Sequence, residues 1–303
     1  MSNLNHAIYL SSDFSCQVGA PATARSTAPS PALMTQAFTA EPWVILSPIE
    51  RSIKQKIEAV GTPLKDWDIS INYGIKTGFN DAFIITGAKK DELIAADPKS
   101  AEIIRPILRG RNIKRYGYDF ADEWLINTHN GVKEKGIKPI NIDDFPAVKK
   151  HLDSYYPQLE KRADKGDSPY NLRNCAYMDV FSKPKIFYRE IGFVLDAIYM
   201  EQEFIINNKL YCLTGEKLKY LLGIFNSKMF DYILGTTANV TGNKGWDFMQ
   251  HIHIPVPATE QELRLITLTE RRLAGEVIDS EIDDLVYKLY GLTAEEIAVI
   301  EIQ

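Results

Sequence analysis

The densest group of charged side chains is a basic segment, residues 105–116, which reads Arg-Pro-Ile-Leu-Arg-Gly-Arg-Asn-Ile-Lys-Arg-Tyr. No acidic residue lies between Glu102 and Asp119. Such a run can neutralise several phosphates, and arginine is also the side chain best shaped for the O6 and N7 acceptors of guanine. A solvated charged turn explains these residues equally well on their own. The candidate contacts are Arg109, Arg111, Asn112, Lys114 and Arg115.

Two further segments place amide, hydroxyl and lysine side chains on predicted loops. Residues 73–83 predict a strand, a turn with two glycines and a second strand, and residues 236–246 lie between a predicted helix and a strand. In the second loop an asparagine could pair with adenine N6 and N7 and a lysine could hold a phosphate. A plain hairpin turn and an ordinary surface loop are the alternatives. The side chains concerned are Lys76, Thr77, Asn80, Asn239, Asn243 and Lys244.

A fourth candidate is the predicted strand at residues 183–190. Alternation along a strand would put Lys185 and Arg189 on one face with Phe187, and Ile186 and Tyr188 on the other. The two cations are therefore added to the candidate contacts, and a half-buried strand is the alternative.

Motifs for catalysis are missing from the sequence. There is no G-x-G for a dinucleotide or S-adenosylmethionine and no P-loop. Adenine amino methylation needs an Asn/Asp/Ser-Pro-Pro-aromatic turn, and Ser168-Pro169-Tyr170 lacks one proline. For a metal-dependent nuclease the nearest match is Asp97-Pro98-Lys99, in a loop-like segment. His251 and His253 have no further ligands at metal-site spacing and indicate a polar strand face. We therefore predict no catalytic residue, metal or cofactor in this chain.

Composition is that of a globular protein: 303 residues, 45% hydrophobic and 25% charged. No apolar run is long enough to span a membrane, and the N-terminal residues lack the basic and apolar regions of a secretory signal. Three scattered cysteines predict a reduced, cytoplasmic protein. The net charge is −5, but residues 259–303 hold 11 acidic and 4 basic residues, which leaves 29 acidic and 31 basic in residues 1–258. The acidity is thus confined to the C-terminal tail, so binding to an anionic partner is not excluded.

The pattern of apolar residues predicts an α+β fold of mixed, twisted strands with inserted helices and a C-terminal helical hairpin. Residues 1–40, rich in Ser, Ala, Thr and Pro, predict a tail or linker. Ser47, Pro48 and Glu50 predict the start of a helix that Gly61 ends. Further helices are predicted at residues 91–96, 101–108, 145–162, 215–234, 260–274, 275–290 and 294–301, and strands at 68–73, 82–86, 123–127, 185–189, 193–196, 204–206, 210–214 and 252–257.

Seven of these segments, in this order, resemble the TaqI-like C-terminal specificity (target recognition) domain of type II and type IIG restriction-modification adenine-N6 DNA methyltransferases. The resemblance covers about residues 43–303. It rests on INYGIKTGFNDAF (71–83), IRPILRGRNIKRY (104–116), KPKI (183–186), KYLLGIFNSK (219–228), GNKGW (242–246), IHIPVP (252–257) and IDDLVYKLYGL (282–292).

The resemblance implies a double-β-helix-like strand assembly that forms one wall of a cleft for double-stranded DNA. It also implies a partner, a methyltransferase and possibly nuclease domain or subunit, that binds S-adenosylmethionine. The expected division is residues 1–40 as a tail or the stub of that catalytic domain, 41–258 as the DNA target-recognition domain and 259–303 as the helical hairpin. Two alternatives remain open: an enzyme with an unrecognised site, and a protein-interaction module of a phage-defence complex.

Overall fold

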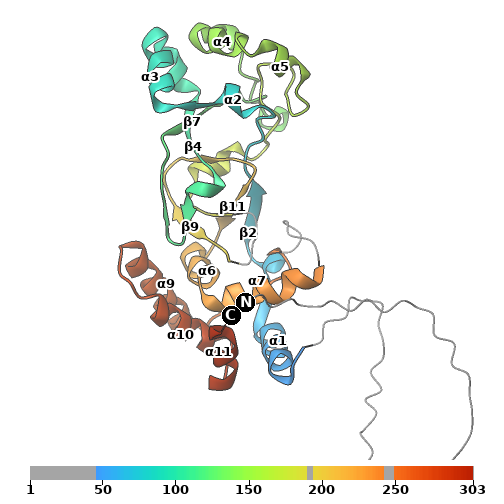
Figure 1. The fold of residues 1–303 in the computed structure, drawn as a ribbon, viewed down its shortest axis with the longest axis vertical. Helices are drawn as coiled ribbons and strands as arrows, with labels where there is room; N and C mark the ends of the chain where they lie inside the picture. The colour runs from blue at the N-terminus through green and yellow to red at the C-terminus, as the bar shows by residue number, and fades with distance from the viewer. Residues whose placement is uncertain (1–45, 190–193, 242–248, 303) are drawn as a thin grey trace, which may run out of the picture. The chain divides into compact units, whose positions relative to one another are not determined.

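The computed structural model describes residues 46–189, 194–241 and 249–302, with side chains through residue 236 in the second range. All of them lie in one compact unit, Pro42–Gln303 (Figure 1). The α-helices are α1 (Pro48–Val60), α2 (Asn80–Phe83), α3 (Gly87–Ala96), α4 (Pro146–Asp153), α5 (Tyr156–Lys161), α6 (Leu218–Phe225), α7 (Lys228–Thr241), α9 (Thr259–Leu273), α10 (Asp279–Leu289) and α11 (Ala294–Glu301).

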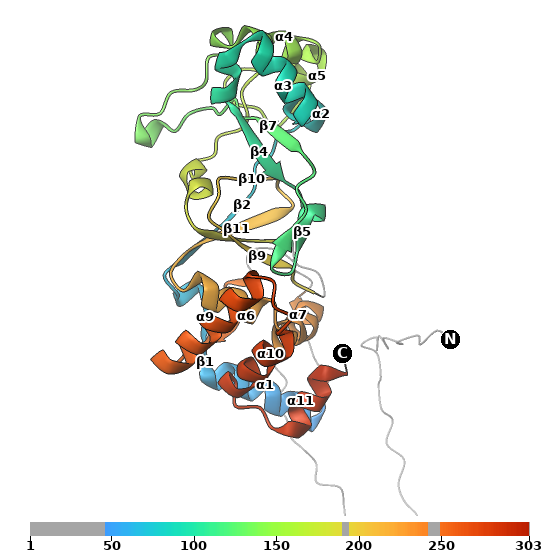
Figure 2. The ribbon, with the colours of Figure 1, turned by 90° about the vertical axis from the view of Figure 1, so that its left-hand side faces the viewer.

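Two four-stranded sheets organise the strands. The first is antiparallel, with the order β2-β11-β8-β9, and the second is mixed, with the order β10-β4-β7-β3 (Figure 2). Two two-stranded ladders, β1-β12 and β5-β6, complete the described part of the fold. The strands are β1 (Gly61–Pro63), β2 (Ile69–Tyr73), β3 (Ile84–Thr86), β4 (Ile104–Leu108), β5 (Ile113–Lys114), β6 (Gly117–Tyr118), β7 (Glu123–Ile126), β8 (Lys185–Arg189), β9 (Ala197–Met200), β10 (Ile205–Ile206), β11 (Leu210–Gly215) and β12 (His253–Pro255).

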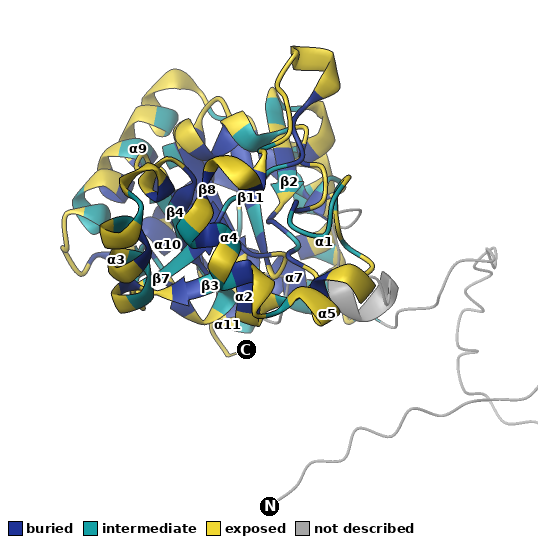
Figure 3. Cartoon of the chain, turned by 90° about the horizontal axis from the view of Figure 1, so that it is seen from above, coloured by how far each residue is buried: buried dark blue, intermediate teal, exposed yellow. Residues whose placement is uncertain are grey.

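The first sheet separates two hydrophobic cores. Along β8, Ile186 and Tyr188 enter one core while Phe187 enters the other, as strand alternation requires. Helices α1, α6, α7, α9, α10 and α11 pack in the first core, which we call the helical core. The second sheet, with α3 and α4, packs in the other, the strand core. Figure 3 shows this dark-blue interior beneath an exposed rim. The α+β prediction with C-terminal helices is confirmed.

Helix α1 begins and ends where its sequence predicts. Ser47 and Glu50 form a reciprocal capping box, with the Ser47 amide 2.7 Å from the Glu50 carboxylate, and Pro48 occupies the first turn. Its Ile53 is fully buried in the helical core. The helices of residues 259–303 share that same core, so the boundary predicted at residue 258 crosses continuous packing and stays a prediction.

Five predicted elements differ from the structure. Residues 104–108, predicted as part of a helix, form β4, because the neighbours β7 and β10 supply the ladder bonds for a segment rich in isoleucine. The strand predicted at 82–86 begins only at Ile84, after the short helix α2. The strand predicted at 193–196 lies at 197–200. The helices predicted at 145–162 and 215–234 are each broken in two, the second at Asn226-Ser227.

Strand β8 is buried on both faces, which differs both from the predicted exposed face with Lys185 and from the half-buried strand of the alternative. Its residues from Lys185 to Tyr188 are all fully buried, and only Arg189 is exposed. The reason is that the sheet has a hydrophobic core on each side. Within the described ranges no helix is long and apolar enough to cross a membrane, and no group of three or more His, Cys, Asp or Glu side chains could hold a metal ion.

Candidate nucleic-acid interface

Two of the predicted loops leave the fold side by side, on either side of residues 206–208. The Ile75 amide donates to the Ile206 carbonyl at 2.7 Å, and the Asn208 amide donates to the Ile75 carbonyl at 3.1 Å. On the other flank the Asn207 amide donates to the Leu108 carbonyl at 3.1 Å. The loops that begin at residues 76 and 109 therefore start on either side of one short turn. We call this arrangement the loop junction.

The third member of the loop junction is a turn that no sequence motif indicated. Residues 207–209, Asn-Asn-Lys, connect β10 to β11, and Asn208 and Lys209 are exposed there. Asn207 is mostly buried, and its side-chain Oδ1 has no hydrogen-bond partner among the described residues. The only sequence signal was a pair of asparagines and a lysine between two short apolar runs, which is typical of any tight turn.

The loop after residue 75 is fixed from below by a buried arginine. Arg162 donates to backbone carbonyls of Thr77, Asp164, Pro169 and Asn171 and stacks on the Phe83 ring at 4.5 Å. Burial lowers the pKa of Arg162 to about 10, so it remains charged at neutral pH. A guanidinium with carbonyl partners on several segments holds them as one rigid unit.

Within that loop the three candidate side chains differ in exposure. Thr77 is buried and its hydroxyl donates to Asn80 Oδ1 at 2.6 Å. Asn80 is exposed at the start of α2. Lys76 is partly exposed, and its ammonium lies 5.8 Å from the centroid of the Tyr73 ring. Lys76 and Asn80 thus present polar groups at the surface, whereas Thr77 shapes the loop.

All five basic side chains of the basic segment are paired with carboxylates. Arg109 and Arg111 share one oxygen, Glu123 Oε1, at 3.2 and 2.6 Å, while Glu123 Oε2 is buried without a partner in the described part of the chain. The pairs Arg105–Glu203, Lys114–Asp119 and Arg115–Asp231 complete the set. Arg111 and Lys114 are each 63% exposed in their side chains and can exchange a carboxylate for a phosphate at small cost.

Asn112 is a structural residue of the basic segment. It is buried, its Oδ1 accepts from the Arg109 amide at 2.7 Å, and its Nδ2 donates to the Asp119 carbonyl at 2.8 Å. These bonds close the short helical turn Gly110–Asn112. Since donor and acceptor are both used inside the fold, Asn112 has no free edge for a base here.

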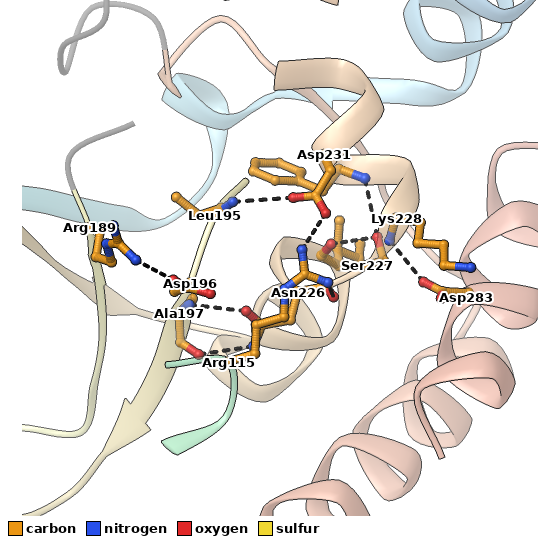
Figure 4. A network of polar contacts seen from close by, with 12 residues as sticks. Arg115, Arg189, Leu195, Asp196, Ala197, Asn226, Ser227, Lys228, Asp231 and Asp283 are labelled. Atoms are coloured by element: carbon orange, nitrogen blue, oxygen red, sulfur yellow. Dashed lines mark hydrogen bonds and ion pairs between the residues drawn. The ribbon is translucent and has the colours of Figure 1, made fainter. Parts of the chain in front are cut away.

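Arg115 joins the strand assembly to the helices instead of facing outward (Figure 4). Its guanidinium donates to the Asn226 carbonyl at 3.0 Å and pairs with Asp231 of α7. Asn226 itself bonds Ala197 of β9 in both directions, at 3.0 and 2.9 Å. Burial raises the pKa of Asp231 and outweighs the lowering by Arg115. The basic segment is thereby fixed against the break between α6 and α7.

The remaining predicted contacts are scattered. Lys185 is fully buried, with its ammonium 2.8 Å from the carbonyl oxygens of Lys183 and Gln202, so it is held inside the fold. Arg189 is half exposed and pairs with Asp196 at 2.6 Å, and it lies opposite Leu210, the residue of β11 that follows the loop junction. Asn239 lies in the last turns of α7, with its side chain outside the description. Asn243 and Lys244 lie outside the described residues.

A second carboxylate in Figure 4 gives the fold a pH dependence. Asp283 of α10 accepts from the Lys228 amide at 2.9 Å at the start of α7, and burial raises its pKa to about 6. Because the folded pKa exceeds the ordinary value, this group's contribution to stability is greatest at acid pH and falls as the pH rises from about 4 to 6.

We therefore expect Asp283→Asn to gain stability relative to the natural chain as the pH rises. The amide oxygen keeps the acceptor for Lys228, and the difference in unfolding free energy should shift in favour of the variant by on the order of 2 kcal/mol between pH 4 and pH 7. Urea titrations at several pH values measure this difference. A difference that is constant over the range would show that the Asp283 pKa is ordinary.

One family model matches part of the chain. The model of the TaqI-like C-terminal specificity domain matches residues 105–248, which include the basic segment, β8 to β11 and the helix break that Arg115 binds. Residues 105–248 are thus similar to a TaqI-like specificity domain, as the sequence motifs indicated.

The solved structures that resemble the chain include two restriction enzymes. The type IIL restriction-modification enzyme MmeI, solved in complex with DNA, matches with a TM-score of 0.54 and 13% identity over 80% of this chain and 35% of its own. The type IIG restriction endonuclease BpuSI matches with a TM-score of 0.45 and 16% identity over 80% of this chain and 33% of its own. At this identity the MmeI match shows a shared fold. The chain spans about a third of the length of either enzyme.

Proposed function

We propose that this chain recognises a specific sequence in double-stranded DNA as the target-recognition part of a restriction-modification enzyme that methylates adenine at N6. The observation that carries the proposal is the loop junction, two of whose three loops lie in the part of the chain that is similar to a TaqI-like specificity domain. Three polar loops from distant parts of the sequence meet there, at residues 76–80, 109–112 and 207–209. Several segments that present amides and cations from a rigid framework of strands are what base reading in a groove requires.

The chemistry of methyl transfer belongs to a partner in this proposal. A methyltransferase domain or subunit, with or without a nuclease, would bind S-adenosylmethionine and form the opposite wall of the DNA cleft. The enzyme would act in the cytoplasm and protect the cell against phage DNA. The similarity of the fold to MmeI, which was solved with DNA, supports the recognition of DNA by this chain. The resemblance in the sequence supports adenine as the target.

Selection of DNA from a random duplex library tests sequence recognition directly. The chain should enrich one short motif, and Asn208→Ala should relax the motif at one position by about 1–3 kcal/mol of discrimination. Sequencing of DNA from the source cell for N6-methyladenine should then find the modification in the same motif. Binding without any sequence preference would contradict recognition, and a different modified base in the motif would contradict the adenine assignment alone.

A further inference from the structure

Near the loop junction lies a loop that no motif indicated and whose positive charges are mostly without carboxylate partners. Residues 131–138, Gly-Val-Lys-Glu-Lys-Gly-Ile-Lys, form a tight excursion with three lysines and one glutamate, which we call the lysine hairpin. Every residue from Lys133 to Pro139 is exposed. In Figure 2 this light-green segment extends away from both sheets.

The lysine hairpin is rigidly built. Val132 and Ile137 exchange backbone hydrogen bonds of 2.9 and 3.1 Å, and the Gly131 amide donates to His129 Nδ1 at 3.1 Å. Gly131 and Gly136 have φ values of 70° and 67°, and a Cβ on Gly131 would lie 2.4 Å from the Ile137 carbonyl oxygen. These backbone conformations suit glycine at low cost. The excursion is therefore a defined projection.

The lysine hairpin packs in neither hydrophobic core. The apolar side chains of the lysine hairpin, Val132 and Ile137, belong to neither the helical core nor the strand core, and Ile137 is 47% exposed. Asn130, at its base, binds Asp167 through both its amide nitrogen and its amide oxygen. These bonds fix the hairpin to residues 164–171, a segment whose backbone carbonyls Arg162 also binds. A rigid projection that contributes nothing to a core is suited to contact with a partner.

The lysine hairpin is connected to the loop junction by a continuous path of side chains. From Lys76 the path runs over the Tyr73 ring to Tyr177, whose ring centroid lies 5.8 Å from that of Tyr73. Tyr177 is followed by the turn Met178–Ser182, in which Asp179 accepts from Lys135 at 2.8 Å and from Lys183 at 2.9 Å. These two bonds lower the pKa of Asp179 to about 2, so the carboxylate is ionised and holds the hairpin in place at every physiological pH.

Two cations of the lysine hairpin are left over. The side-chain ammonium groups of Lys133 and Lys138 have no ion pair or hydrogen bond within the described ranges. The basic segment differs, because each of its five cations already has a carboxylate partner. A phosphate that binds Lys133 or Lys138 displaces counterions alone, whereas one that binds Arg109 must compete with Glu123.

On this basis we infer that the lysine hairpin holds the sugar-phosphate backbone of the DNA through Lys133 and Lys138, while the loop junction faces the bases. This assignment rests on the proposed function. It makes the hairpin a sequence-independent contact that positions the duplex, and it predicts that the hairpin sets the salt dependence of binding more than the basic segment does.

Fluorescence anisotropy of the full chain with a labelled duplex, over a range of salt concentrations, tests the inference. Lys133→Ala with Lys138→Ala should make the negative slope of log K against log salt shallower by about 1.8. The same variant should weaken binding about tenfold at 0.1 M salt for every duplex sequence alike. Lys65→Ala with Lys288→Ala, on the helical side, is the matched control and should leave the slope unchanged. Thermal unfolding confirms that both variants fold, since all four lysines are exposed.

The outcomes separate the two proposals. If the natural chain binds DNA but the hairpin variant has the same salt slope as the control variant, the inference is overturned and sequence recognition still stands. The inference alone would also be overturned if Arg109→Ala with Arg111→Ala accounts for the slope and the hairpin variant does not. A natural chain that binds no duplex in this assay and enriches no motif from the library would overturn both.

Discussion

Replacement of Arg115 by alanine is expected to destabilise the protein by about 3 kcal/mol, measured as the free energy of unfolding in urea. The side chain is 29% exposed and connects the basic segment to Asp231 and to the Asn226 carbonyl. Its loss leaves a mostly buried carboxylate without its counter-charge. Because burial already raises the Asp231 pKa, the variant should recover part of its stability on acidification, as Asp231 takes up a proton.

Matched variants show whether the loss reflects the buried charge. Arg189→Ala removes a half-exposed partner of Asp196 and should cost less than about 1 kcal/mol. The double variant Arg115→Met with Asp231→Leu removes both charges together and should be closer to the natural stability than Arg115→Ala alone. If Arg115→Ala and Arg189→Ala cost the same, Arg115 does not connect the strands to the helices as described.

Local signals in the sequence predict an element well when its causes lie within it. Helix α1 is the clear case, because Ser47 and Glu50 cap each other three residues apart and the apolar stripe has a single period. The β4 segment shows the limit of such signals. Residues 101–108 carry apolar residues at spacings that suit a helix, but residues 104–108 pair with strands whose partner residues are 18 to 22 and 98 positions away in the sequence. No local pattern contains that information.

The candidate site divides in the same way. Its residue types were visible in the sequence, but their partners were not. In the sequence the cations of the basic segment have no acidic neighbour, but in the structure Glu123, twelve residues after Arg111, binds two of them. Lys185 alternates with apolar residues as a surface cation would, but a core on each side of β8 buries it. In both cases the pairing depends on a sheet that brings distant segments together.

Neither the Asn207–Lys209 turn nor the lysine hairpin has a motif, and each gains its meaning only from position. The turn matters because residues 75 and 108 bond to either side of it. The hairpin matters because Tyr73 and Tyr177 connect it to Lys76. A search for such elements from sequence alone would need the pairing of β10 with β4, which joins two-residue and five-residue strands in parallel and leaves almost no local signal.

Gly74 makes the loop junction possible, and Gly74→Ala is expected to cost about 3 kcal/mol of unfolding free energy. A Cβ at this position would lie 2.2 Å from the Asn207 carbonyl oxygen and 2.3 Å from that of Ile206. Both obstacles are backbone atoms bonded into the sheet, so the methyl group can be accommodated only if residues 206–208 separate from residue 75. Hydrogen exchange should therefore speed up at the amides of Ile75 and Asn208, and the preference for a DNA motif should weaken with it.

Gly136→Ala is the control for this prediction, because it isolates backbone strain from steric conflict. Gly136 has a φ of 67°, but no atom lies within 4 Å of its added Cβ, so the variant should cost only about 1 kcal/mol. Its exchange rates at Ile75 and Asn208 should be those of the natural chain. If Gly74→Ala were as mild as Gly136→Ala and left those amides protected, residues 75 and 206–208 would not be in close contact. The loops at residues 76 and 109 would then lack the common support on which base reading by the loop junction depends.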